Sequence, residues 1–212
     1  MPDREIKMNN ILDFLRIAER LHYEKRTLQM GNGEKQPVSS HSWMMSIMAL
    51  CLAPKLPHSI DIGKVLKLCA VHDLAESRTK DIPLHQQEKI ENIKDKKLAA
   101  EMIAMQEFQS MLGTPTGNEI YELWHEYEKR ETYEAQFVKI LDLLDVCVQL
   151  ACSQTIDYMG EYDDAFYWRR WYNKKYIAQF DFAPATREFF DTIQSYVESR
   201  MIEAGINPEQ YK

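Results

Sequence analysis

The stretch IDIGKVLKLCAVHDLAES, residues 60–77, holds the strongest structural signal in the chain. Its apolar residues recur at helical spacing, and Val65 and Cys69, four positions apart, lie on one face of the predicted helix. His72 and Glu76 continue that face at further intervals of three and four. The apolar part of the face should point into a core, so ionisable groups are expected where water is scarce. A buried charge is costly unless it is paired or bound to a metal, and a divalent cation would compensate it.

Spacing alone leaves an alternative, in which the helix reaches the surface after Val71 and its polar end is solvated. An adjacent His72–Asp73 pair also arises by chance in many proteins. A further histidine, His41, follows two serines at positions 39–40, either of which can cap a helix that runs to Pro54. A lone histidine in a first helical turn is typical of a surface or hydrogen-bonded residue as well as of a ligand.

A third polar feature lies in FVKILDLLDVCVQL, residues 137–150, which reads as a buried helix. Asp142 and Asp145 lie on a narrow polar strip of this otherwise apolar segment. Periodicity does not decide whether the strip is a solvated face or turns one of the two aspartates toward a metal.

The rest of the chain predicts an all-α protein. Only seven of the 212 residues are glycine, and no alternating strand pattern stands out. Helices are predicted over about 10–21, 39–53, 60–77, 84–112, 118–129, 134–157 and 185–204, with Asn10 as N-cap of the first and a loop from Lys25 to Val38. We expect one domain over 1–212, with a core of about 10–157 and a C-terminal helical extension, 158–212. The aromatic stretch 158–182 is interpreted as a packing or dimer surface, with base stacking as the alternative.

Composition narrows the classes of partner. Lysine and arginine total 26 against 33 acidic residues, so the net charge of -7 provides no basic footprint for a nucleic acid duplex. No run approaches the roughly 18 apolar residues that span a bilayer, and no membrane partner is expected. The four cysteines form no CxxC pair and read as core residues of a reducing compartment, which favours the cytoplasm.

The order of these residues resembles the HD-domain phosphohydrolase superfamily: a histidine, a His-Asp pair some thirty residues later, and an aspartate in a late helix. Within it the chain is most similar to the branch of bacterial 5'-deoxynucleotidases and related small HD hydrolases. Four stretches carry the resemblance: VSSHS at 38–42, HDLAESRTKDIP at 72–83, IYELWHEYE at 120–128 and FVKILD at 137–142. The resemblance covers roughly residues 10–150 and implies a compact HD-domain helical bundle.

The resemblance also implies roles for particular residues. One divalent metal would be held by His41, His72, Asp73 and Asp142. Glu76 and Asp81 match an acidic E-x4-D element that orients or activates the attacking water and would be catalytic, while Arg26 falls at the position of a phosphate-contacting arginine. Two imidazoles and two carboxylates leave open positions on a six-coordinate ion, and this ligand set suits Co, Mn, Mg or Zn.

Three departures from the family pattern keep the substrate open. Ser40 replaces an acidic residue before the first histidine, Thr27 replaces a tryptophan that lines the sugar pocket, and Lys80 replaces a glycine. We therefore expect a metal-dependent 5'-deoxynucleotidase that acts on deoxynucleoside monophosphates. A deoxynucleoside triphosphate phosphohydrolase is the alternative, with Lys80 as an additional substrate-binding charge. A non-catalytic nucleotide-binding protein is the alternative of another class. By analogy with relatives, a homo-oligomer (a dimer or larger) is expected.

Overall fold

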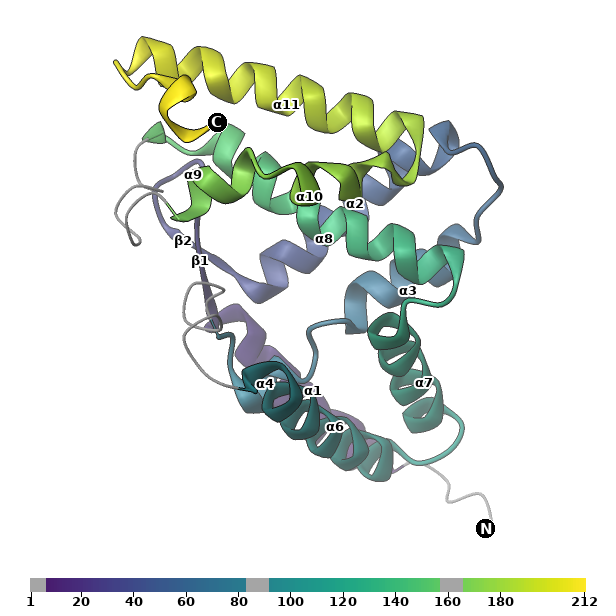
Figure 1. Cartoon of the computed structure of the whole chain (residues 1–212). Coiled ribbons are helices and arrows are strands. Elements are labelled where there is room, and N and C mark those ends of the chain that lie inside the picture. Colours follow the sequence, from purple (N-terminus) through teal and green to yellow (C-terminus); the bar gives the residue numbers. More distant parts are fainter. Residues whose placement is uncertain (1–6, 83–91, 157–165) are drawn as a thin grey trace.

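The structure, a computed structural model, describes residues 7–82, 92–156 and 166–212 (Figure 1). The part of the chain before the His-Asp pair contains α1 (Met8–Ala18), η1 (Glu19–His22), β1 (Lys25–Gln29), β2 (Lys35–Pro37), α2 (Val38–Leu52), η2 (Ala53–Lys55) and α3 (Ile62–Val71). The middle contains α4 (Glu76–Thr79), α6 (Ile93–Leu112), α7 (Thr116–Lys129) and α8 (Tyr133–Cys152). The last part contains α9 (Phe166–Trp171), α10 (Lys174–Ile177), η4 (Ala178–Phe182), α11 (Pro184–Glu203) and η5 (Pro208–Tyr211). The prediction of a helical fold is confirmed.

Helix α8 forms the centre of the molecule. It packs against α2, α3, α7, α11 and β1, and it crosses the middle of the view in Figure 1. Thr132 caps its first turn, because the threonine side chain accepts a hydrogen bond from the backbone nitrogen of Ala135. Other elements cover α8 on most sides, so much of the helix is buried, including the polar residues Asp145 and Gln149.

The segment around the His-Asp pair crosses between two apolar clusters. Leu68 and Cys69, at the end of α3, belong to the larger cluster, which α8 dominates. Leu74 and Ala75 belong to a second cluster, which α1, α6 and α7 build with them. His72 and Asp73 therefore lie where the two clusters meet, on a turn that both sides hold in place.

The predicted helix over 60–77 is interrupted at this turn. Helix α3 ends at Val71 with His72 as its C-cap, and α4 begins at Glu76. The expectation of burial nevertheless holds, because His72 and Glu76 are both almost fully buried. The solvated helix end that spacing left open is therefore excluded.

The predicted loop from Lys25 to Val38 is wrong. Strands β1 and β2 pair antiparallel in this stretch, with an irregularity in the register. Gly33, at the turn, has φ +83, a conformation that glycine adopts without strain. The strands are too short for a period of two to stand out, and β1 is supported by its packing against α8.

Two predicted helix caps are also wrong. Helix α1 starts at Met8, and Asn10 instead donates its side-chain amide to the carbonyl oxygen of Met111 on α6. Helix α2 starts at Val38, directly after Pro37, so neither serine of 39–40 is its cap. The fixed φ of proline suits the entry to a helix, and here this backbone preference outweighs side-chain capping.

The C-terminal helices cover α8. Helix α11 packs along α8, and Trp168 and Trp171 of α9 are buried in the larger cluster, as the packing interpretation expects. The predicted cluster members Tyr158 and Tyr162 lie outside the described residues. The division into a core of 10–157 and an extension stays a prediction. Within the described part of the chain, no helix combines the length and hydrophobicity that a membrane crossing requires.

Candidate metal centre and active site

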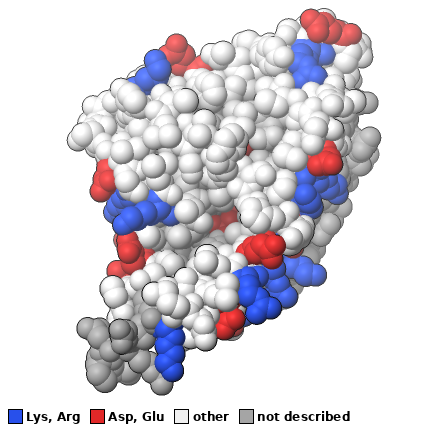
Figure 2. Space-filling view, turned by 180° about the vertical axis from the view of Figure 1, so that it is seen from behind, with Lys and Arg blue, Asp and Glu red and all other residues white. Residues whose placement is uncertain are grey.

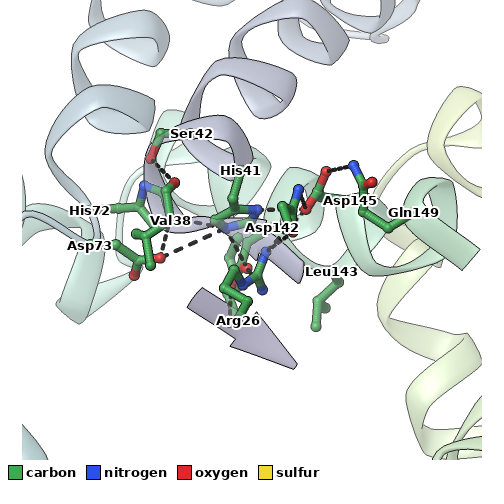
Figure 3. A network of polar contacts seen from close by, with 12 residues as sticks. Arg26, Val38, His41, Ser42, His72, Asp73, Asp142, Leu143, Asp145 and Gln149 are labelled. Atoms are coloured by element: carbon green, nitrogen blue, oxygen red, sulfur yellow. Dashed lines mark hydrogen bonds and ion pairs between the residues drawn. The ribbon is translucent and has the colours of Figure 1, made fainter. Parts of the chain in front are cut away.

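Four side chains that are distant in sequence converge beside the start of α2 (Figure 3). The Nε2 atoms of His41 and His72 lie 3.3 Å apart. An oxygen of Asp73 lies 3.1 Å from Nε2 of His72 and 3.8 Å from Nε2 of His41. Oδ1 of Asp142, from α8, lies 3.2 Å from Nε2 of His41. Ligands about 2.1 Å from one cation lie roughly 3 Å from each other, and the facing atoms of His41, His72 and Asp73 are grouped closely enough to share one ion, with Asp142 beside His41.

The hydrogen bonds on the far sides of the rings define which nitrogen faces the centre. Nδ1 of His72 donates to the carbonyl oxygen of Cys69 at 2.9 Å, and Nδ1 of His41 donates to the carboxylate of Asp145 at 2.7 Å. In the neutral imidazoles both Nε2 atoms then carry lone pairs. Two lone pairs and two carboxylates, all electron-rich and largely buried, point at one another. This donor set needs positive charge between its members: protons on the imidazoles supply it when no ion is bound, and the donor types present also fit a divalent metal ion.

Asp142 is held by further donors on its other oxygen. The hydroxyl of Tyr127 donates to Oδ2 at 3.1 Å, and the ammonium of Lys139 approaches it to 2.6 Å. Burial alone would raise the pKa of Asp142, but Lys139, His41 and Arg26 hold it well below the ordinary range. The pKa of Asp73 is also lowered, since His72 and His41 outweigh its burial. Both carboxylates are therefore charged, as metal ligands must be.

Arg26 lies next to this centre, as the resemblance implies. Its NH1 donates to Asp145 at 3.0 Å and to Gln36 at 3.2 Å, and its NH2 lies 3.7 Å from Asp142. The sequence interpretation did not predict that Asp145 and Gln36 hydrogen-bond to Arg26. The polar strip of α8 was a signal for Asp145, but its partners on α2 and β1 are not visible in the spacing.

A cavity of about 580 Å³ opens beside the centre. Of the residues with expected roles, the described lining includes Arg26, His72, Asp73, Glu76, Asp81 and Asp142. His41 is fully buried behind them. Further lining residues include the cationic side chains Lys94, Lys97, Arg130, Lys139 and Arg170, and the apolar or aromatic side chains Leu143, Val146, Trp171 and Tyr176.

Glu76 and Asp81 lie on the same cavity as the four convergent groups. Lys97 of α6 donates to Glu76 at 3.0 Å. Burial and the neighbouring Asp73 raise the pKa of Glu76 well above its usual range, against the effect of Lys97. Burial likewise raises the pKa of Asp81, although Arg26 opposes this. Two carboxyl groups with raised pKa values beside a metal-type centre are typical of proton-transfer sites.

Lys80 is an expected site residue that the structure places away from both the metal-type group and the described cavity lining. Its side chain is exposed and is absent from the described lining residues. Its backbone has φ 70 and ψ 155, a region that is essentially restricted to glycine. Glycine adopts this region without strain, whereas lysine is strained there.

We predict that Lys80→Gly stabilises the protein and leaves catalysis intact. Relief of the backbone strain should raise the free energy of unfolding by about 1 kcal/mol, after the entropy of glycine is subtracted. Urea denaturation measures the change, and kcat/KM should stay within about twofold. Lys80→Ala removes the same charge without relieving the strain and serves as the control. A large drop in kcat/KM in both variants would show that Lys80 does bind substrate.

A buried carboxyl group on the cavity wall makes stability depend on pH. Burial raises the pKa of Glu101 to about 7 from an ordinary 4.5, against the effect of Lys97. Between these two values the folded chain binds more protons than the unfolded chain, so stability falls as pH rises through this window. In metal-free protein, Glu101→Gln should reduce that fall by about 1–3 kcal/mol. Urea denaturation at pH 5 and pH 8 tests this, with the exposed Glu119→Gln as control. If Glu119→Gln reduced the fall in stability between pH 5 and pH 8 as much as Glu101→Gln does, the prediction would be contradicted.

The protein is therefore a helical bundle whose buried histidines and aspartates suit one divalent cation. Comparison with known families agrees, because a model described as "HD domain" matches residues 18–178. A Dictyostelium discoideum protein named 5'-deoxynucleotidase HDDC2 is 36% identical over 67% of this chain and 76% of its own length. The protein of the same name from Danio rerio is 37% identical over 67% of this chain and 68% of its own length. The chain therefore belongs to the HD-domain family.

Solved structures share the fold. A predicted metal-dependent phosphohydrolase from Magnetospirillum magnetotacticum has a TM-score of 0.73 at 21% identity, covering 96% of this chain and 100% of its own. A Pyrococcus horikoshii protein has a TM-score of 0.62 at 26% identity, covering 88% and 98% of the two chains. Both confirm the compact helical bundle that the resemblance implies.

Proposed function

We propose that this protein is a metal-dependent 5'-deoxynucleotidase, which releases phosphate from deoxynucleoside monophosphates. The observation that carries the proposal is the close grouping of His41, His72 and Asp73 around a site that could hold a metal ion, with Asp142 3.2 Å from His41, beside Arg26 and a cavity. Sequence identity above 30% to several proteins named 5'-deoxynucleotidase supports it. These four residues would hold the ion, and Co, Mn, Mg and Zn all suit the ligand set.

The polar end of the cavity suits a phosphate monoester. A divalent cation bound there would neutralise charge on the phosphoryl oxygens and lower the pKa of water. Arg26, anchored by Asp145 and Gln36, presents a planar fork of donors to two phosphate oxygens. Its position beside the four ligands would hold phosphorus next to the ion.

Glu76 and Asp81 supply proton transfer. Hydrolysis joins a water oxygen to phosphorus and breaks the bond between phosphorus and the 5' oxygen of the sugar. Glu76 takes a proton from the attacking water, and the 5' oxygen must gain one as it leaves. Asp81 lines the same cavity and, when protonated, would give the leaving 5' oxygen that proton. Lys97 holds the carboxylate of Glu76 in one orientation through its 3.0 Å hydrogen bond.

The apolar and aromatic part of the cavity lining suits the nucleoside. Leu143, Val146, Trp171 and Tyr176 form apolar and aromatic lining from α8, α9 and α10. The guanidinium of Arg170 lies 5.0 Å from the centre of the Tyr176 ring. A ligand with a charged end and a flat, largely apolar end matches a cavity of this kind. The aromatic stretch of the sequence thus contributes to the cavity as well as to packing.

A phosphate-release panel tests the proposal. Purified protein is given each deoxynucleoside monophosphate, the matching ribonucleotides and the deoxynucleoside triphosphates, with Co, Mn, Mg or Zn in turn. Inorganic phosphate should appear from the deoxynucleoside monophosphates. Triphosphate release from deoxynucleoside triphosphates would favour the alternative substrate class. Nucleotide binding without any product would favour the non-catalytic alternative. Lys80, which motivated the triphosphate, lies away from the described cavity lining.

We also propose a homo-oligomer. One face of the molecule has a broad area without charged side chains (Figure 2). Large exposed apolar side chains are concentrated on two helices: Met8, Leu12 and Leu15 of α1, and Trp43, Ile47 and Leu50 of α2. Exposed apolar groups at helical spacing are typical of protein interfaces. Sedimentation velocity measures the assembly, and a monomer at micromolar concentration would contradict it. The cytoplasmic location stays a prediction.

A further inference from the structure

One buried carboxylate, that of Asp145, hydrogen-bonds both to a histidine of the metal-type group and to Arg26. Asp145 is fully buried on α8, one helical turn after Asp142, and contacts His41 on the ring nitrogen opposite the one that meets Asp142. Its Oδ2 accepts from Nδ1 of His41 at 2.7 Å, NH1 of Arg26 at 3.0 Å and Nε2 of Gln36 at 3.0 Å. Its Oδ1 accepts from Nε2 of Gln149 at 3.1 Å (Figure 3).

We propose that Asp145 is a positioning residue that orients the metal-facing imidazole of His41 and the phosphate-facing guanidinium of Arg26 with the same carboxylate. Its effect on His41 needs only the metal site, whereas its effect on Arg26 rests on the proposed function. Asp145 touches neither metal nor phosphate and acts through these two neighbours.

The first effect is on the tautomer of His41. A carboxylate accepts but cannot donate, so Nδ1 of His41 must carry the proton and Nε2 must present its lone pair to the centre. With the other tautomer, an N–H group would point at the cation. A carboxylate behind a metal-binding imidazole also raises its basicity as a ligand.

The second effect is on the direction of Arg26. Its side chain is only 16% exposed, and two carboxylates compete for it. Asp145 holds NH1 at 3.0 Å, whereas NH2 stays 3.7 Å from Asp142. Without Asp145, the guanidinium would pair with Asp142 and compete with the cation for that ligand. Asp145 thereby separates the cationic arginine from the metal-binding carboxylate.

Packing alone does not account for a charge at this position. The neighbouring Leu141 and Leu144 are fully buried and apolar, and an apolar residue at 145 would avoid the cost of burying a carboxylate. Two of the four donors to Asp145 belong to the proposed site. The charge is therefore explained by the orientation of these two groups.

The experiment compares Asp145→Asn with Thr186→Val in the full chain. Thr186 is equally buried and hydrogen-bonded but lies at the start of α11, so its variant controls for loss of a buried polar group. Titration calorimetry with Mn²⁺ should show about 10- to 100-fold weaker binding for Asp145→Asn and an unchanged constant for Thr186→Val. At saturating Mn²⁺, KM should rise for Asp145→Asn. Wild-type Mn²⁺ affinity in a folded Asp145→Asn variant would overturn the proposal.

A second measurement reads the tautomer of His41 in the wild-type protein. Nitrogen-15 spectra of histidine-labelled, metal-free wild-type protein report the tautomer of each ring, and His41→Gln assigns the signal. The proposal requires a proton on Nδ1 of His41, and a proton on Nε2 alone would overturn it. Neither this readout nor the metal constant uses a nucleotide. A protein that releases no phosphate from any nucleotide therefore refutes the proposed function, while the effect of Asp145 on His41 is still decided.

Discussion

Replacing Asp73 with alanine is expected to remove both bound metal and phosphate release. The Asp73 carboxylate lies 3.1 Å from Nε2 of His72 and 3.8 Å from Nε2 of His41, so the change deletes one of four convergent ligands. Charge stabilisation by a metal is worth several kcal/mol, and each 1.4 kcal/mol is about tenfold in rate. We therefore expect kcat/KM to fall at least about 1,000-fold. Two measurements test this prediction: the metal content of the dialysed protein and its rate of phosphate release.

The exposed Asp13→Ala variant provides the control for this experiment. Asp13 lies on α1 and pairs only weakly with Arg16, so its removal should change neither metal content nor turnover. Full activity in Asp73→Ala would mean that the site is assigned wrongly. Loss of metal with full activity would mean that hydrolysis does not depend on the ion.

Replacing Glu76 with glutamine is expected to lower kcat about 100- to 10,000-fold, the range typical of a lost general base. Glutamine has the same shape and can still accept a hydrogen bond from Lys97, but it cannot take a proton from water. Metal content should stay at the wild-type level, since Glu76 is not one of the four convergent ligands. KM should change little, so that the loss lies in kcat.

Glu107→Gln is the matched control, because Glu107 is also a glutamate in an ion pair, with Arg78, but is exposed. It should retain wild-type kcat. A Glu76→Gln variant within a few-fold of wild type would assign proton transfer to another group, and Asp81→Asn would then be the variant to compare.

The local signals in the sequence succeeded where a helix buries one continuous face. The apolar run of α8 and the stripe of α3 both predict what the structure contains. They failed for β1 and β2, which are short and rely on contact with α8. They also failed to detect the break after Val71, because the stripe continues across the turn although the helix does not.

Residue types and their order in the sequence were sufficient to identify most of the site residues. They did not predict how those residues contact one another. Asp142 and Asp145 occupy the same polar strip, and helical periodicity treats them alike. In the structure Asp142 meets Nε2 of His41, while Asp145 meets Nδ1 of the same ring. Lys80 and Lys97 show the converse, since the nominated lysine is exposed and the other binds Glu76.

The sequence by itself determined the helical class, the central buried helix and the paired imidazoles and carboxylates that make a metal centre chemically reasonable. Those properties follow from residue type and from spacing within one helix, which are local. Only the tertiary structure decided that Arg26, His41 and Asp145 share one network across more than a hundred positions. Such contacts depend on how helices pack, and the free energy of that packing comes from apolar side chains far from the groups it brings together.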